Sequence, residues 1–312
     1  MLSILAITFP IFLLILVGWG ATISGITSAA NIRGIGVFVI RLALPAMLFR
    51  ALSQRPILAL LDWNYLGVYV AGSLFAFGFV FLSARVFAKR DVADAAMMGL
   101  GSSSSNSGFI GFPIAVMVVG PDALVALSLT LIVENLVMIP IGLGLAESGR
   151  RAGEPIHRIL LFVLRRLTRN PMILGILAGC AASATGWLPP APLQRAIDLL
   201  ADASTAAALF AIGGALASLR LSTVGWDIGG IVSGKLLLHP LAVGLALLVL
   251  PAPAIAHQQA MLIFAASPML SVYALLSQTY GHEKRAAAAL LGATSLSFLT
   301  LTLLVGWLHA PF

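Results

Sequence analysis

The chain carries very little charge. Asp, Glu, Lys and Arg make up 9% of its 312 residues, whereas a soluble domain carries roughly 25%. Apolar residues make up 60%, and the mean hydropathy is +1.05. Because so few polar side chains cannot cover a surface that faces water, lipid must surround most of the protein. The composition therefore excludes a soluble globular domain and predicts a membrane protein.

Signals of several other classes of protein are also missing from the sequence. Cys180 is the one cysteine, which excludes an intramolecular disulfide and a thiolate metal site. The net charge is +7, but no basic stripe is interleaved with aromatic residues, so we expect no nucleic-acid partner. No cation precedes Arg33, and the first apolar run is therefore interpreted as a retained helix rather than a signal peptide.

Catalytic and nucleotide-binding motifs are absent as well. The sequence has no G-x-x-x-x-G-K-[ST] loop, no H-E-x-x-H helix and no G-x-S-x-G elbow. We therefore expect neither ATP hydrolysis nor an intramembrane enzyme, and no cofactor or resident metal. If the protein moves a solute, the energy must come from a gradient, and the sequence leaves Na⁺ and H⁺ open as the coupling ion.

Ten apolar runs are long enough to cross roughly 30 Å of hydrocarbon. Turn residues or charges separate them. They cover residues 2–22, 34–53, 64–87, 94–118, 122–146, 170–187, 193–218, 225–250, 256–279 and 286–308. The sequence predicts an all-α, multi-pass protein with ten transmembrane helices, which we number 1 to 10.

A basic segment divides the ten helices into two sets of five. We predict a first repeat at 1–147, a cytoplasmic basic linker at 148–169 and a second repeat at 170–312. Because five is an odd number, two similar halves must insert with opposite orientation, which predicts an inverted repeat. Cations concentrate in this linker and in the other loops after odd-numbered helices. The positive-inside rule then places both termini outside, across a bacterial inner membrane.

Helix 4 is a poor regular helix. Its sequence, GLGSSSSNSGFIGFPIAVMVVG at 99–120, contains several glycines and Pro113, and each Gly costs about 1 kcal/mol and each Pro about 3 kcal/mol in a helix interior. An unwound backbone survives at membrane depth only where it is buried in protein or lines a cavity. We predict a break from about Asn106 to Pro113. Tight helix packing through small residues is the alternative explanation.

Helix 9 carries a corresponding interruption at Pro268. Paired breaks in two halves indicate a binding site, where two half-helix N-termini favour a carboxylate. The candidate substrate-binding residues come from both helices. They are Ser104, Ser105, Asn106, Ser107, Gly108, Pro113, Ser267, Pro268 and Ser271.

Ionisable residues inside spans are further candidates, because burying one in lipid costs at least about 2.5–3.5 kcal/mol. Lys235 and His239 are four residues apart and share a helix face. Together with Glu134 they are predicted to couple an ion or to compensate charge, and an ion pair between Lys235 and Glu134 is the structural alternative. Arg41 and Arg50 are expected to reach the interface or to pair with a carboxylate.

Several motifs resemble the auxin efflux carrier family, and within it the bacterial members of the malonate-transporter type. They are NSGFIGFPIA at 106–115, LALPAMLFRAL at 42–52, IVENLVMIP at 132–140, KLLLHP at 235–240 and SPMLSVYALLSQTYG at 267–281. The resemblance implies a fold like that of bile-acid symporters and sodium/proton antiporters, with helices 4 and 9 crossed. It also implies a homodimer, a scaffold of helices 1, 2, 6 and 7, and a transport domain of helices 3–5 and 8–10.

The expected function is secondary transport of a small organic acid anion. The resemblance implies malonate, malate or lactate, or auxin in the plant branch, carried by alternating access as the transport domain moves like an elevator. The expected partners are this anion and the lipid bilayer. The alternatives left open are a carrier for another small solute, such as an auxin-like compound or an amino acid, and an uncoupled channel or receptor.

Overall fold

The computed structural model describes residues 2–54, 62–150, 161, 164–165, 168–218 and 225–308, and these form helices joined by short loops. The α-helices of the first half are α1 (Leu2–Ile23), α2 (Ala29–Phe38), α3 (Leu44–Ser53), α5 (Trp63–Val86), α6 (Val92–Ser103), α7 (Phe112–Val119), α8 (Asp122–Val133) and α9 (Ile139–Arg150). Those of the second half are α11 (Pro171–Thr185), α12 (Ala191–Ser218), α13 (Trp226–Ser233), α14 (His239–Val249), α15 (Ile255–Ala266), α16 (Tyr273–Gln278) and α17 (Glu283–Leu308).

Four π-helical turns interrupt these helices, and each is followed by a proline. They are η1 (Val39–Ala43), η2 (Ser107–Gly111), η3 (Glu134–Met138) and η4 (Gly234–Leu238), and the prolines are Pro45, Pro113, Pro140 and Pro240. A proline lacks an N–H donor, and its ring clashes with the carbonyl four residues earlier. A wider π turn accommodates that ring without ending the helix. The prolines therefore bend these segments and leave each one continuous.

Polar side chains begin several helices, and glycines end two of them. Asp62 accepts a hydrogen bond from the backbone N–H of Tyr65 at 3.0 Å, and Asp91 accepts one from that of Asp94 at 2.8 Å. These side chains satisfy N–H groups that have no partner within the helix. Gly120 and Gly186, both with positive φ, terminate α7 and α11.

The structure supports a multi-pass membrane protein. Within the part of the chain that the structure describes, six helical segments are long and apolar enough to cross a bilayer. They are Ala29–Ser53, Trp63–Val86, Asp122–Arg150, Ala191–Ala217, Trp226–Val249 and Lys284–Leu308. Four shorter apolar helices cover Phe12–Ile23, Ser107–Val119, Pro171–Thr185 and Ile255–Ala266. The prediction of a polytopic all-α protein is confirmed, while the number of ten crossings stays a prediction.

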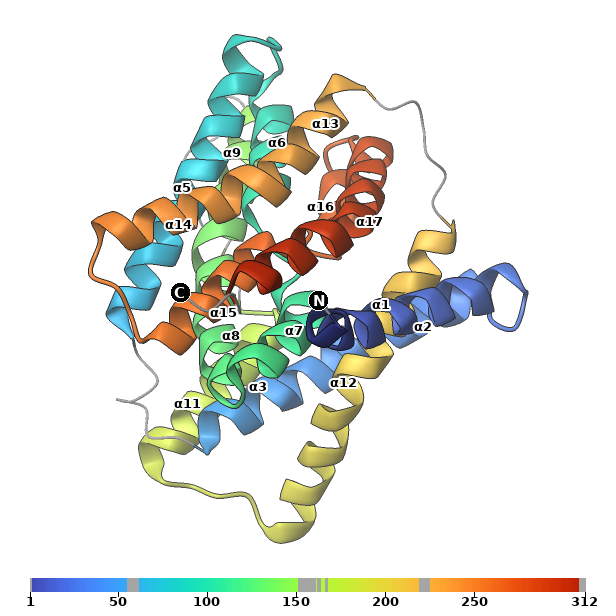
Figure 1. The fold of residues 1–312 in the computed structure, drawn as a ribbon, viewed down its shortest axis with the longest axis vertical. Coiled ribbons are helices and arrows are strands. Elements are labelled where there is room, and N and C mark those ends of the chain that lie inside the picture. The colour runs from blue at the N-terminus through green and yellow to red at the C-terminus, as the bar shows by residue number, and fades with distance from the viewer. Residues whose placement is uncertain are drawn as a thin grey trace.

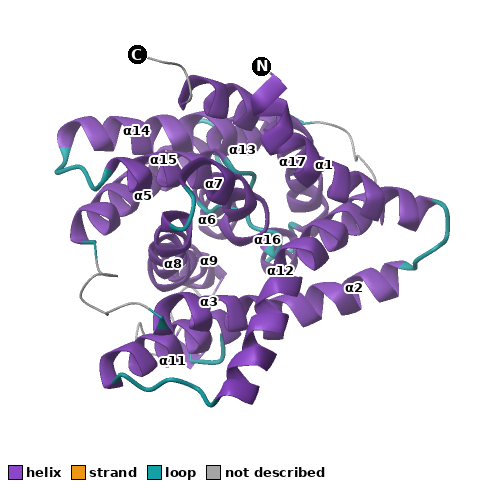
Figure 2. Ribbon diagram, turned by 60° about the horizontal axis from the view of Figure 1, so that its bottom comes forward, coloured by secondary structure: helices purple, strands orange, loops and turns teal. Residues whose placement is uncertain are grey.

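The helices at the start of one half pack against the helices at the start of the other. α1 packs along α12, and α3 packs along α11. α12 also contacts α2 and α3, so these five helices form one group, which runs from the bottom of Figure 1, where α3 and α11 lie, to its right side, where α1 and α2 lie. Figure 2 shows the same group from a second direction. The 151–160 stretch and residues 162, 163, 166 and 167 of the predicted linker lie outside the described residues.

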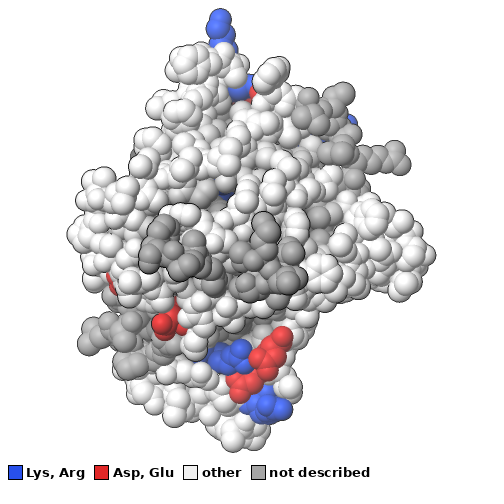
Figure 3. Space-filling model, in the orientation of Figure 1, with Lys and Arg blue, Asp and Glu red and all other residues white. Residues whose placement is uncertain are grey.

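The remaining helices form the second group. α5 lies between α6 and α14, α15 contacts α7 and α8, and α17 contacts α13 and α16 (Figure 1). Most of the fully buried side chains come from this group, including Tyr65, Tyr69 and Phe264. Figure 3 shows a broad band almost without charge between the two ends of the molecule, as expected of a surface in contact with lipid.

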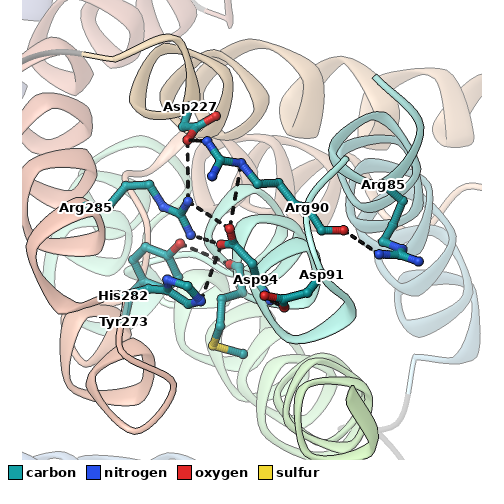
Figure 4. A network of polar contacts seen from close by, with 9 residues as sticks. Arg85, Arg90, Asp91, Asp94, Asp227, Tyr273, His282 and Arg285 are labelled. Atoms are coloured by element: carbon teal, nitrogen blue, oxygen red, sulfur yellow. Dashed lines mark hydrogen bonds and ion pairs between the residues drawn. The ribbon is translucent and has the colours of Figure 1, made fainter. Parts of the chain in front are cut away.

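Charged side chains at one end of the second group bind to one another. Arg285 of α17 contacts Asp94 of α6, and Arg90 contacts Asp227 of α13 (Figure 4). Arg285 Nη1 also lies 3.5 Å from Asp227 Oδ2, and His282 Nε2 lies 3.6 Å from Asp94 Oδ1. This network joins three helices that are far apart in the sequence.

Arg50 pairs with carboxylates of α12. Its Nη1 lies 2.8 Å from Asp202 Oδ1 and 3.6 Å from Asp198 Oδ1. The expectation that Arg50 pairs with a carboxylate is thus confirmed. The ion pairs join α3 to α12 within the first group of helices.

Close contact between α1 and α12 requires glycine at position 18. A Cβ atom at Gly18 would overlap the backbone carbonyl of Phe210, whereas a Cβ at Gly20 would meet nothing within 4 Å. We predict that Gly18→Ala lowers the free energy of unfolding by about 1–3 kcal/mol through overpacking. Thermal denaturation of the purified protein in detergent measures this change. Gly20→Ala on the same helix is the control, and equal melting temperatures for both variants would contradict the packing.

Candidate functional site

The first break in helix geometry follows the serine run. α6 ends at Ser103, and Ser104 is extended, with φ −115° and ψ 131°. Asn106 adopts φ −83° and ψ 56°, and helical structure resumes at Ser107 with η2. The break therefore begins and ends earlier than the predicted stretch from Asn106 to Pro113. Pro113 lies inside the continuous helical segment Ser107–Val119, where the π turn η2 accommodates its ring.

The second break lies at the predicted proline. α15 ends at Ala266, and Ser267 is extended, with φ −65° and ψ 152°. Pro268 follows directly, and because the residue before a proline is restricted to extended conformations, the helix cannot continue. The chain becomes helical again at Tyr273, the first residue of α16.

The two breaks cross and bind to each other through their backbones. The N–H of Asn106 donates to the carbonyl of Pro268 at 2.7 Å, and the N–H of Leu270 donates to the carbonyl of Ser104 at 3.3 Å. The pairing forms an isolated antiparallel bridge between Ser105 and Met269. Each unwound segment thus satisfies polar groups of the other, which unwound backbone inside a membrane requires.

A glycine allows the close approach beside the crossing. A Cβ atom at Gly111 would lie 2.7 Å from Cδ1 of Phe264 and 2.8 Å from Oγ of Ser267. Both neighbours belong to the other interrupted helix. A larger residue at position 111 would therefore push the two interrupted helices apart.

A cavity of about 480 Å³ opens beside the crossing. One wall is formed by the break in helix 4, by η3 and by the segment that follows Pro268. The opposite wall comes from η1 and from the start of α11. The polar residues that line it are Arg41, Ser105, Asn106, Ser107, Glu134, Asn135, Arg169, Asn170 and Ser271. The cavity therefore lies between the two groups of helices and is lined by residues from both.

Glu134 faces the crossing from η3. Its Oε1 accepts hydrogen bonds from the N–H of Ser105 at 3.0 Å, from Oγ of Ser107 at 2.8 Å and from the hydroxyl of Tyr69 at 3.4 Å. The residue is 4% exposed. This carboxyl group is held at the N-terminal end of the second half of helix 4, where negative charge is favoured.

Lys235 and His239 are fully buried and do not line the cavity. Lys235 Nζ donates to the carbonyl of Ala265 at 2.5 Å and lies 3.0 Å from Nδ1 of His239. Nε2 of His239 lies 2.9 Å from Oγ of Ser73. The carbonyl of Ala265 belongs to the last turn of α15, where it has no partner within the helix. Lys235 thus caps the negative end of the interrupted helix.

The structure brings part of the predicted set to the cavity. Ser105, Asn106, Ser107, Gly108, Ser271 and Glu134 line it. Ser104, Pro113, Ser267 and Pro268 belong to the interrupted segments but do not line the cavity, and neither do Lys235 and His239. Lys235 and Glu134 form no ion pair within 4.0 Å, which rules out their direct pairing in this conformation.

Sequence reasoning missed four polar residues of the cavity, namely Arg41, Asn135, Arg169 and Asn170. The position of Arg41 in the middle of an apolar run indicates a functional residue. The sequence alone does not predict that its side chain is directed toward the cavity. Asn170 Nδ2 donates to Asn135 Oδ1 at 2.9 Å, while Asn170 Oδ1 accepts from the N–H of Met172. This contact links the start of α11 to η3 across the cavity.

The chain is similar to known transport proteins over nearly its whole length. The family described as "Membrane transport protein" matches residues 3–305. A protein of Rhizobium meliloti (strain 1021) named "Putative malonate transporter" is 31% identical over 304 residues, which cover 97% of this chain and 95% of that protein. The "Uncharacterized transporter YfdV" of Escherichia coli (strain K12) is 26% identical over 236 residues, or 75% of this chain and 74% of its own length.

Water should reach the cavity, and cysteine labelling tests this. We substitute Cys180 by Ser and introduce Met172→Cys, because Met172 lines the cavity. A membrane-impermeant charged maleimide is expected to label this variant rapidly in detergent. Met261→Cys serves as the control, since Met261 is fully buried and does not line the cavity. Equal labelling of the two cysteines would show that the cavity is not open to water.

Proposed function

Since this chain belongs to the auxin efflux carrier family of membrane transport proteins, we propose that it is a secondary transporter of a small organic anion of the malonate type. The anion binds in the cavity beside the crossing of the two interrupted helices. Transport proceeds by alternating access across a bacterial inner membrane. Members of such a family move solutes and do not transform them, so the protein is not an enzyme.

The observation that carries this proposal is the position of Arg41. It is the central residue of the apolar segment Ala29–Ser53, and its side chain lines the cavity. No described residue forms an ion pair with it. A guanidinium group within a membrane-spanning segment and without a counter-charge is costly, and an anion in the cavity reduces this cost. A planar guanidinium group also matches a carboxylate in geometry.

The opposite wall supplies a second set of groups for an anion. The helical segment Ser107–Val119 begins at the cavity, and the positive end of its dipole points toward the crossing. Asn106 and Ser271 add an amide and a hydroxyl group on the same wall. In this proposal one carboxylate of a dicarboxylate binds at Arg41 and the other at the crossing, and these groups favour malonate over a neutral solute.

Helix contacts support the inverted repeat. If helix 1 corresponds to helix 6 and helix 2 to helix 7, a contact between helices 1 and 7 requires an equivalent contact between helices 6 and 2. Helix 1 contains α1, helix 2 contains α3, helix 6 contains α11 and helix 7 contains α12. The packing of α1 on α12 and the packing of α11 on α3 are therefore these two equivalent contacts. The crossed breaks form a second corresponding pair. These contacts favour ten segments in two halves, 1–147 and 170–312, related by an inverted repeat.

The two groups of helices support a division into moving parts. We assign the group formed by α1, α2, α3, α11 and α12 to a scaffold, and the remaining helices to a transport domain. The cavity lies between them, so an anion bound there contacts both. Movement of the transport domain along the scaffold would carry the crossing and its anion from one side of the membrane to the other.

The test compares Arg41→Gln with wild type in thermal denaturation with malonate. Malonate at 100 times its dissociation constant should stabilise the wild-type protein by about 2.7 kcal/mol. Loss of a charge partner costs at least about 2 kcal/mol, so we predict binding at least about 30-fold weaker for Arg41→Gln. Arg41→Lys should bind with intermediate strength, because it retains the charge but loses the planar geometry.

Two controls make the result specific. Arg33→Gln removes an arginine of α2 that does not line the cavity, and it should bind malonate as the wild type does. Malonamide, which has the same carbon chain without charge, should not stabilise the protein.

No stabilisation of folded wild type by any carboxylate would contradict the organic-anion proposal and favour amino acids or neutral solutes. Conductance without counterflow would instead identify a channel.

A further inference from the structure

Glu134 is in an unusual position for a buried carboxyl group. It lines the proposed anion cavity, yet its Oε1 already accepts hydrogen bonds from the N–H of Ser105 and the hydroxyl of Ser107. These two residues lie on either side of Asn106. These are the groups at the start of the second half of helix 4, which would otherwise be free to bind an anion. An ionised Glu134 is therefore an internal anion in the site proposed for the substrate.

Among the described residues, no cation pairs directly with the charge on Glu134. Lys235 donates to Ala265 and contacts His239, and it makes no ion pair with Glu134 within 4.0 Å. The other titratable or charged groups around the carboxyl are Tyr65 and Tyr69 on α5, His239 on α14, and Arg41 and Arg169 on the far wall of the cavity. A buried carboxylate without a paired cation is costly even when it accepts hydrogen bonds, and a proton removes the charge.

We infer that Glu134 is the group whose protonation couples the uptake of one proton to the binding of each substrate anion. This inference rests on the proposed function of the cavity. When Glu134 is ionised, it occupies the donors at the crossing and repels a second anion. When it is protonated, the repulsion disappears and the substrate carboxylate can bind near Arg41 and the crossing. Proton and anion are then carried together.

The hydrogen-bond geometry favours a proton over Na⁺. Three donor hydrogens point at Oε1, so this oxygen has no lone pair left and only Oε2 could ligate a metal ion. Oε2 makes no hydrogen bond to a described residue and is the atom that takes up the proton. Nor do the described residues contain a cluster of three His, Cys, Asp or Glu side chains that could hold a cation.

The first experiment measures malonate binding as a function of pH, in a range where malonate itself stays doubly ionised. Wild-type affinity should fall about tenfold per pH unit once Glu134 ionises, since one proton is taken up with each anion. Isothermal calorimetry in buffers of different ionisation enthalpy should report that proton directly. Affinity and heat that do not depend on pH or buffer would overturn the inference, even if malonate binds well.

The second experiment uses Glu134→Gln, which keeps the size and the Oε1 acceptor but cannot ionise. Its malonate affinity should vary less than about twofold over the same pH range, with no proton uptake. In proteoliposomes it should retain measurable malonate counterflow but lose accumulation driven by an imposed pH gradient. Glu147→Gln, a buried acid of α9 that does not line the cavity, is the control and should accumulate malonate as the wild type does.

Ser107→Ala keeps the inference testable if Glu134→Gln does not fold. It removes one donor to the ionised carboxyl group, so the ionised form becomes less favourable. The pH above which malonate binding weakens should therefore shift upward. An unchanged midpoint would contradict the role of Glu134. Wild-type protein without malonate counterflow would instead contradict the proposed function itself, so the two failures are distinguishable.

Discussion

The structure depends on one backbone contact inside the membrane region, between the N–H of Asn106 and the carbonyl of Pro268. Interrupting two helices leaves polar backbone groups that lipid cannot satisfy. Here each break supplies partners for the other, and Lys235 caps the end of α15 through Ala265. Because the two breaks depend on each other, the crossing forms as a unit. That unit then presents Asn106 and Ser107 to a cavity.

The charges in the cavity are subject to the same constraint, because lipid cannot satisfy a charged group any more than a polar one. A membrane protein excludes unpaired charge from its interior, yet Arg41 and Glu134 both line this cavity without a direct counter-ion among the described residues. In the proposed function, the substrate anion and a proton supply what is missing. Arg41 gains a partner when the anion binds, and Glu134 loses its charge when the proton binds. With Arg169 as the second arginine of the lining, the two positive charges then balance a doubly ionised malonate beside a protonated Glu134, so the loaded cavity is neutral in this proposal.

Much of this organisation could be predicted from the sequence, because composition and breakers act locally. Low charge identified the membrane protein, and Pro268 located the second break. The serine run located the first one only approximately, since the π turn η2 accommodates Pro113 within a continuous helical segment and the break precedes that segment. Arg41 was missed for a different reason. The side of a helix from which an arginine projects depends on how the helices pack, and Asn170 reaches Asn135 only because α11 lies beside η1.

The most direct test of the central claim is to locate a bound anion. A crystal structure of the protein with bromomalonate would mark the ligand by the anomalous scattering of bromine. The account predicts one strong peak in the cavity, between the guanidinium group of Arg41 and the crossing at Asn106. A peak outside the cavity, for example at the network formed by Arg90 and Arg285, would contradict it.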